Sequence, residues 1–388
     1  MTALRRYGIP IAIVIAALPA IVRSVHLTQA PQFAAPLVHP RVLDGRPQYS
    51  AEFLPATSTH VVHGSSIAEL ADGDLLAVWY GGSDETRTDV AIYASRCDHR
   101  TGRWTDPQVI ETPDSAERAL RTRVKSVGNP VVFAAGPRVS LFYTAILFGG
   151  WSAGTICLKD STDGTTWSPA RHVRTSPLFN IGMLVRGRPW LYADGSIALP
   201  IYQQLERRWS AIARVTAGGD VVDQVRIEDP RPLIQPWIVP TAPSSAVAFL
   251  RSASRMPSSV TVTKSDDGGM HWDPVFGTSL VQRDSAVAGA RLADGSLLAI
   301  YNNTAWDRRD LSMARSPDGG IHWSKPFPIE RDTSPDNIVR REYSYPYLIQ
   351  ANDGTYHLLY TWQRTRIRHI AFNDAWLLAQ FQLRSFRG

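Results

Sequence analysis

The polar residues that recur most regularly in this chain are serine and aspartate pairs in a repeated turn sequence. Ser316–Trp323 and Ser265–Trp272 follow the pattern S-x-D-x-G-x-x-W, and worn copies occupy 161–167 and 97–104. In a tight turn, such side chains bond to the turn's own backbone, and the glycines can adopt positive φ. We therefore expect these aspartates to be structural and not catalytic.

Another polar stretch, Gly81–Asp89, offers Asp84 and Glu85 as carboxylates that could act in acid–base chemistry. Cys97 and Cys157 are the two cysteines of the chain, and the sequence leaves open whether they pair. No Cys/His spacing indicates a structural zinc, so we expect neither a metal nor another cofactor. No run of Lys or Arg indicates nucleic-acid binding.

Two sets of sequence repeats indicate the secondary structure that must position such residues. The turn tryptophans at 104, 167, 272 and 323 are separated by 63, 105 and 51 residues, so the middle interval spans about two units. Periods near 50 residues built of short strands are typical of propellers and other repeat arrays. Ala-Asp-Gly recurs at 71–73, 193–195 and 293–295, with a looser copy at 352–354, each between apolar alternating runs. That pattern predicts hairpins, and a hairpin plus two further strands makes a propeller blade.

We therefore predict an all-β fold, a six-bladed β-propeller. Ala51–Leu54 is expected to close the ring by pairing with the last blade, which would protect exposed sheet edges. The apolar tail Ala375–Leu383 is expected to pack as a final strand. The six units are predicted to begin near residues 61, 131, 182, 238, 286 and 345.

The N-terminus differs in composition from this body. Arg5 and Arg6 precede an apolar run, Tyr7–Val22, which indicates a signal peptide or an N-terminal membrane anchor over residues 1–27. Residues 28–47 are Pro-rich and are predicted to be a linker to the propeller at 48–388. The prediction is an exported protein that is periplasmic, secreted or membrane-anchored, and monomeric. The formal charge of +6 fits an anionic ligand without requiring one.

With these turns, the sequence resembles the sialidase (neuraminidase) superfamily from about Val61 to Leu383. The S-x-D-x-G-x-x-W turns look like the Asp-boxes of that superfamily. Sialidases bind a sugar carboxylate with three arginines, whose planar forks suit that group. Leu250-Arg251-Ser252, before the turn at Ser265, matches one family motif, and Trp306-Asp307-Arg308-Arg309-Asp310-Leu311 matches another. The resemblance therefore implies that Arg251 and Arg308 bind substrate.

The resemblance also implies catalytic groups. The family nucleophile is a tyrosine followed by serine at the start of the last blade, and Glu342-Tyr343-Ser344-Tyr345-Pro346 places Tyr343 there. Tyrosine suits an anionic sugar, which a carboxylate nucleophile would repel. The family acid is an aspartate in the loop of the first blade, which points to Asp84, with Glu85 as the adjacent alternative.

Two positions depart from the family pattern. His63 stands where the first arginine is expected, and Gln235 stands nearest to the glutamate that activates the tyrosine. A glutamine cannot take the tyrosine's proton. His63 therefore remains a catalytic candidate and Gln235 a substrate-binding one, in a branch of bacterial sialidase-like proteins.

Three functions follow. The first is a sialidase-type exo-glycosidase acting on an acidic glycan, with Tyr343 as nucleophile and Asp84 or Glu85 as acid. The second is a polysaccharide lyase that uses His63 and Tyr343 on a uronate held by Arg251 and Arg308. The third is a carbohydrate-binding propeller without catalysis. Products separate them, because a lyase makes an unsaturated uronate and a binder makes nothing.

Overall fold

A computed structural model describes residues 30–36, 38, 45–176, 180–254, 256, 258–334 and 341–385. The predicted signal or anchor segment, residues 1–27, lies outside the described residues. None of the helices within the described part of the chain is long and apolar enough to span a membrane.

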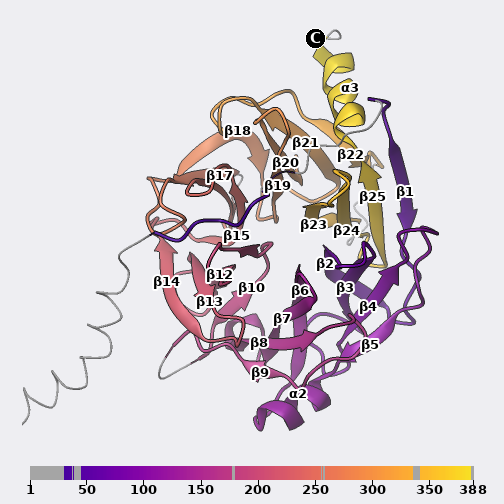
Figure 1. Ribbon diagram of the computed structural model, residues 1–388, viewed down its shortest axis with the longest axis vertical. Helices are drawn as coiled ribbons and strands as arrows, with labels where there is room; N and C mark the ends of the chain where they lie inside the picture. The colour runs from indigo at the N-terminus through magenta and orange to yellow at the C-terminus, as the bar shows by residue number, and fades with distance from the viewer. Residues whose placement is uncertain are drawn as a thin grey trace, which may run out of the picture.

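Six antiparallel sheets are arranged around a central axis, as predicted (Figure 1). The first strand of each blade lies innermost, and the following strands step outward by short hairpins. Blades 1 and 2 are β2 (Val61–Glu69), β3 (Leu75–Gly82), β4 (Ala91–Cys97) and β5 (Gln108–Glu111), then β6 (Ser126–Ala135), β7 (Arg138–Ile146), β8 (Gly154–Ser161) and β9 (Arg171–His172).

The next two blades continue this order, and blade 3 carries an extra short strand. They are β10 (Met183–Val185), β12 (Ile197–Gln203), β13 (Ser210–Val215) and β14 (Val221–Ile227), with β11 (Trp190–Leu191) paired to β12, then β15 (Leu233–Pro240), β16 (Ala246–Ser252), β17 (Ser258–Ser265) and β18 (Phe276–Gln282).

The last two blades end in a closure by the N-terminal strand, as predicted. β1 pairs with the outer strand β25 from Tyr49↔Phe372 to Phe53↔Arg368, so the ring is closed by hydrogen bonds between the two ends of the propeller. The strands are β19 (Ala288–Arg291), β20 (Leu297–Asn302), β21 (Asp310–Ser316) and β22 (Phe327–Arg331), then β23 (Tyr343–Gln350), β24 (Tyr356–Trp362), β25 (Arg366–Phe372) and β1 (Tyr49–Phe53).

The repeated turns lie on the outer rim, between the third and fourth strands of their blades. Ser316 Oγ accepts from the Gly320 amide at 2.8 Å, and Asp318 Oδ1 accepts from the His322 amide at 2.9 Å. Trp323 donates to the Gly320 carbonyl at 2.9 Å. The polar side chains are thus engaged in hydrogen bonds within the turn itself, which agrees with the structural role expected of them.

The C-terminal segment is a correction to the sequence prediction. The tail Ala375–Leu383 was expected as a strand, but it belongs to helix α3 (Asp374–Ser385). Asn373 Oδ1 accepts from the Trp376 amide at 2.9 Å and so caps the helix, a signal that outweighs the apolar composition. The other helices in the described part of the chain are α2 (Pro113–Leu120) and the single turn η1 (Trp151–Ala153).

Part of the Pro-rich stretch predicted as a linker is packed on the propeller. Phe33 is buried, stacks on Tyr192 with ring centroids 5.0 Å apart and donates its amide to the Pro243 carbonyl at 2.7 Å. This segment crosses blades 3 and 4 in front of β15 in Figure 1. The two cysteines, Cys97 and Cys157, are both buried and unpaired.

Candidate functional site

A polar cavity of about 260 Å³ opens on the axis, at the end where the innermost strands begin. Residues from every blade contribute to it, which is the arrangement expected of a propeller's central pocket. The lining comprises His63, Glu85, Asn129, Trp151, Tyr202, Gln204, Ile234, Gln235, Arg251, Arg308, Tyr345 and Arg364.

Four inner strands carry the same irregularity near this cavity. The pairing register shifts at 63–66, 128–131, 234–237 and 344–347, and each bulge contains one residue with positive φ. That residue is Gly64 (φ 60°), Asn129 (46°), Gln235 (52°) or Tyr345 (57°). A bulge with a left-handed residue breaks the strand's alternation and re-aims one side chain. The bulges thereby place Asn129, Gln235 and Tyr345 in the cavity wall.

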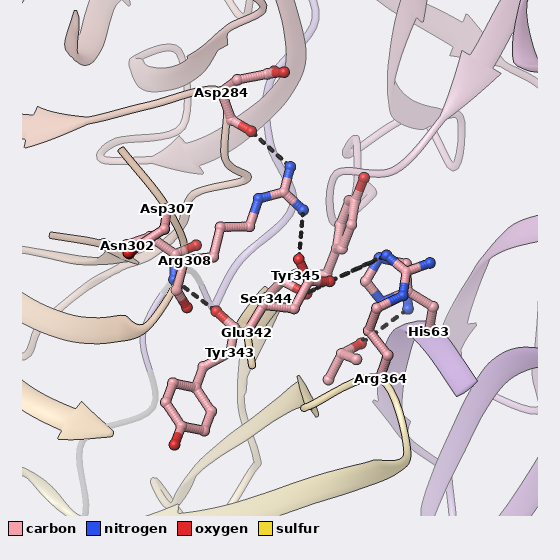
Figure 2. A network of polar contacts seen from close by, with 12 residues as sticks. His63, Asp284, Asn302, Asp307, Arg308, Glu342, Tyr343, Ser344, Tyr345 and Arg364 are labelled. Carbon is pink, nitrogen blue, oxygen red and sulfur yellow. Dashed lines mark hydrogen bonds and ion pairs between the residues drawn. The ribbon is translucent and has the colours of Figure 1, made fainter. Parts of the chain in front are cut away.

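Tyr345 lies at the centre of the polar network (Figure 2). Arg251 Nη1 donates to its hydroxyl at 3.2 Å, and the guanidinium carbons of Arg186, Arg251 and Arg308 lie 5.0, 5.9 and 5.7 Å from its ring centroid. Burial alone would raise the pKa of Tyr345, but the charges of Arg251 and Arg308 outweigh it and lower the pKa overall. The site therefore favours a phenolate more than ordinary surroundings do.

Arg251 is held in place by acidic and amide groups. Its Nε donates to Asp284 Oδ1 at 2.8 Å, and its Nη1 also donates to Gln235 Oε1 at 2.8 Å. Burial lowers the pKa of this guanidinium, but the opposite effect of Tyr345 and Asp284 is larger, so the pKa is raised overall. Gln235 therefore orients Arg251 toward Tyr345 and takes no proton itself.

His63 is almost completely buried beside the same tyrosine. Its ring meets the Tyr345 ring edge-on with centroids 4.6 Å apart, and its Nδ1 lies 3.1 Å from Thr361 Oγ1. Burial and the positive charges of Arg364, Arg308, Arg186 and Arg251 hold the pKa of His63 well below its usual value. The imidazole is thus neutral and cannot replace the missing arginine as a cation.

Carboxylates balance the arginines around the cavity. Arg364 bonds to Glu85 and, at 3.2 Å, to Glu342, and Trp151 Nε1 donates to Glu85 at 3.3 Å. Asp84 stands at the rim with a side chain 40% exposed and 3.9 Å from Arg364. Four guanidiniums (Arg186, Arg251, Arg308, Arg364) lie among four carboxylates (Asp84, Glu85, Glu342, Asp284), so the formal charges balance at 4 − 4 = 0.

Five candidates from the sequence come together here: His63, Glu85, Gln235, Arg251 and Arg308 all line the cavity. Asp84 lies at its edge, next to Glu85. Their roles in catalysis and binding stay predictions.

Tyr343 does not join them, which corrects the position taken from the family motif. Tyr343 lies in the regularly paired part of β23, before the bulge, and its amide donates to the Arg308 carbonyl. Its ring lies against that of Trp362, with centroids 6.5 Å apart. Figure 2 shows its hydroxyl pointing away from the other labelled side chains. Because the bulge follows at 344–347, the tyrosine that reaches the site is Tyr345, two residues later.

Tyr345, Arg186, Glu342 and Arg364 were not identified from the sequence. A signal for the tyrosine exists, because Asn129-Pro130, Gln235-Pro236 and Tyr345-Pro346 place the same X-Pro pair at equivalent bulges. The arginines carry no such signal, since Arg186 follows β10 and Arg364 lies in a hairpin loop without a shared motif.

Comparison with solved structures agrees with the fold. The chain superposes on the Hadza microbial sialidase Hz136 with a TM-score of 0.65 and 16% identity, covering 81% of this chain and 66% of that one. The NanB sialidase of Streptococcus pneumoniae gives 0.66 and 10%, covering 83% and 70%. A protein of unknown function from Dyadobacter fermentans gives 0.64 and 13%, covering 85% and 100%. The chain thus spans about two thirds of the length of Hz136.

Among proteins with a curated description, none matches the chain. The family model described as a BNR repeat-like domain matches residues 73–358, most of the propeller. The chain therefore belongs to the family of BNR repeat-like domains, on the six-bladed fold that the sialidases share.

Proposed function

We propose that this protein is a sialidase-type exo-glycosidase that removes a terminal acidic sugar from a glycan. The observation that carries the proposal is Tyr345, a tyrosine of lowered pKa that is bonded to Arg251 and close to Arg308. The cavity, at about 260 Å³, suits one sugar residue, and the arginines that line it suit a carboxylate.

In this mechanism, Tyr345 attacks the anomeric carbon while Asp84 gives a proton to the departing oxygen at the rim. Water then cleaves the glycosyl–tyrosine bond, with Asp84 now accepting the proton. Arg251 stabilises the phenolate and so takes over part of the work of the glutamate that Gln235 replaces. Glu85 is bound by Arg364 and Trp151, which suits it to positioning that arginine beside the substrate.

Arg308 is the proposed contact for the sugar carboxylate. Its Nη2 donates to the Asp284 carbonyl at 2.7 Å, and its Nη1 lies 3.6 Å from Glu342, so one side of the guanidinium is only loosely engaged. Substituting Arg308 by Met should therefore raise KM more than it lowers kcat.

A lyase acting on a uronate is the second candidate, and the neutral His63 ring against Tyr345 favours it. In that case the Tyr345 phenolate would take the proton next to the uronate carboxyl, the bond to the glycosidic oxygen would break as the double bond forms, and the departing oxygen would receive that proton from Tyr345. A hydrolase releases an intact acidic sugar, whereas a lyase creates a double bond that absorbs in the ultraviolet.

The test is a product-resolved screen of sialosides and uronate oligosaccharides by mass spectrometry and ultraviolet absorbance. Tyr345→Phe should lower turnover about 100-fold or more with little loss of binding, and the matched variant Tyr343→Phe should retain activity. Full activity in Tyr345→Phe, or equal losses in both variants, would contradict the assignment. No product from any acidic glycan, together with retained binding, would leave only the carbohydrate-binding function.

We also propose that the protein is exported, with Arg5, Arg6 and the apolar run Tyr7–Val22 as the support. Fractionation of cells expressing the full chain tests this. Recovery of the intact chain in the cytoplasmic fraction would refute it.

A further inference from the structure

A second cavity, of about 440 Å³, lies at the opposite end of the inner strands. It is bordered by the hairpin turns at Leu70-Ala71, Gly136 and Asn352, whereas the first cavity lies where those strands begin. We call it the lower cavity, and the first cavity, around Tyr345, the upper cavity. Its polar side chains are Glu69, Arg188, Tyr347, Gln350 and Asn352.

Arg188 is the cation of the lower cavity, and it lacks an anionic partner. Its guanidinium carbon lies 4.1 Å above the centroid of the Trp190 ring, and no carboxylate or carbonyl in the described part of the chain accepts a hydrogen bond from it. Burial lowers the pKa of Arg188 to about 10. The charge is therefore partly desolvated without compensation, which an anion would supply.

Tyr347 adds an unpartnered donor to the same cavity. Its side chain is 0% exposed, and its hydroxyl finds no hydrogen-bond partner among the described residues. Trp237 holds the ring edge-on at 5.0 Å between centroids. A buried hydroxyl without a partner is destabilising, so a ligand that accepts a hydrogen bond from it would recover that cost.

Arg186 separates the two cavities. It lies 5.0 Å from the Tyr345 ring centroid and 5.6 Å from that of Tyr347, and it donates to the Ser65 and Tyr345 carbonyls at 2.9 and 3.0 Å. Arg186 is thus occupied by the backbone of blades 1 and 6. The lower cavity must rely on Arg188 alone, so the two cavities can be changed independently.

We propose that the lower cavity is a second ligand site, which binds the carboxylate of an acidic monosaccharide. The Arg188 fork would hold the planar carboxylate, and the Tyr347 hydroxyl would donate to it. Glu69, which accepts from the Asn352 amide at 2.7 Å, and Gln350 offer partners for sugar hydroxyls at the rim. The mixed polar and apolar wall, with Ile67 and Ile349, fits the two kinds of face of a sugar ring.

The inference does not require the glycosidase activity proposed above, because it concerns binding on the far side of Arg186. The experiment is calorimetric titration of the full chain with sodium D-glucuronate, with D-glucose and inorganic phosphate as parallel titrants. We expect glucuronate to bind, glucose to bind much more weakly, and tetrahedral phosphate to bind more weakly than the planar carboxylate.

Arg188→Met should weaken the binding of glucuronate about tenfold or more, because it removes the charged fork. Tyr347→Phe deletes only the hydroxyl and should weaken binding about two- to tenfold, which keeps the test informative if Arg188→Met unfolds. The control Arg100→Met alters an arginine that is 78% exposed and should bind as the wild type does. Arg308→Met in the upper cavity should leave the Arg188-dependent binding in place.

Wild-type affinity in both Arg188→Met and Tyr347→Phe would overturn the proposal, as would equal binding of glucose and glucuronate. Glucuronate binding that persists in Arg308→Met and weakens in Arg188→Met would support it, whatever the activity of Tyr345→Phe. A failure of the catalytic proposal and a failure of this one therefore give different results.

Discussion

Acid should destabilise this propeller through a half-buried histidine on its last blade, His357. His357 lies on β24, with its ring stacked on His369 at 5.2 Å between centroids and its Nδ1 3.0 Å from His369 Nε2. Burial and the neighbouring His369 lower the pKa of His357 to about 3, against a small opposing effect of Asp353. On the far side, Glu52 of β1 lies 3.1 Å from His369 Nδ1, so the pair also faces the strand that closes the ring.

The sign and size of the effect follow from the two pKa values. The unfolded chain protonates His357 near pH 6.5, whereas the folded chain does so near pH 3, so stability is lost as pH falls below 6.5. Between pH 7 and pH 5 the difference amounts to at most about 2 kcal/mol, at about 1.4 kcal/mol for each unit below 6.5.

Urea unfolding at pH 7 and pH 5 measures this directly. Between pH 7 and pH 5, the free energy of unfolding of His357→Gln should fall by up to about 2 kcal/mol less than that of the wild type. The control His60→Gln, which changes an exposed histidine, should lose as much as the wild type. The remaining acid sensitivity of His357→Gln would come in part from His63, whose pKa is also held low. An unchanged acid loss in His357→Gln would refute the reasoning.

Three further outcomes are expected. Arg251→Met removes the cation that lowers the pKa of Tyr345, so that pKa should rise and any rate that depends on the phenolate should need higher pH; an unmoved pH–rate profile would contradict this. Phe33→Ala should lower the free energy of unfolding in urea by about 3 kcal/mol, because the phenyl ring is buried. A loss below about 1 kcal/mol would show that the segment 30–36 does not stabilise the propeller. Gly187→Ala should destabilise by about 1–3 kcal/mol, because its Cβ would lie 2.1 Å from the Pro236 carbonyl, and a normal urea midpoint would count against that close approach.

The fold was predictable from the sequence because its signals are local. The turns at Ser265 and Ser316 bond to themselves, and each Asp-Gly hairpin joins neighbouring strands, so both can be recognised within a few residues. The site was predictable only in part, because its geometry depends on register. A bulge at 344–347 shifts the strand register, so that Tyr345 and not Tyr343 enters the cavity. Counting alternate residues along a regular strand does not reveal such a shift.

The chemistry of the missed arginines depends on closure of the ring. Arg364 meets Glu85 across 279 residues of sequence, at the junction of the last blade with the first. Only the complete circle brings these side chains together. Motifs within one blade therefore could not predict the pair.

The repeated bulge gives the upper cavity a modular character. Four blades have a left-handed position in this bulge; in three of them it supplies one side chain to the cavity, and in the fourth it is Gly64, which supplies none. The residues two places later, Val131, Trp237 and Tyr347, return to the strand pairing and remain buried. Exchanges at 129 and 235 between asparagine, glutamine and glycine therefore replace what faces a ligand and leave the blade interior as it is. The scaffold and the recognition surface can in this way be altered separately in the blades that carry the bulge.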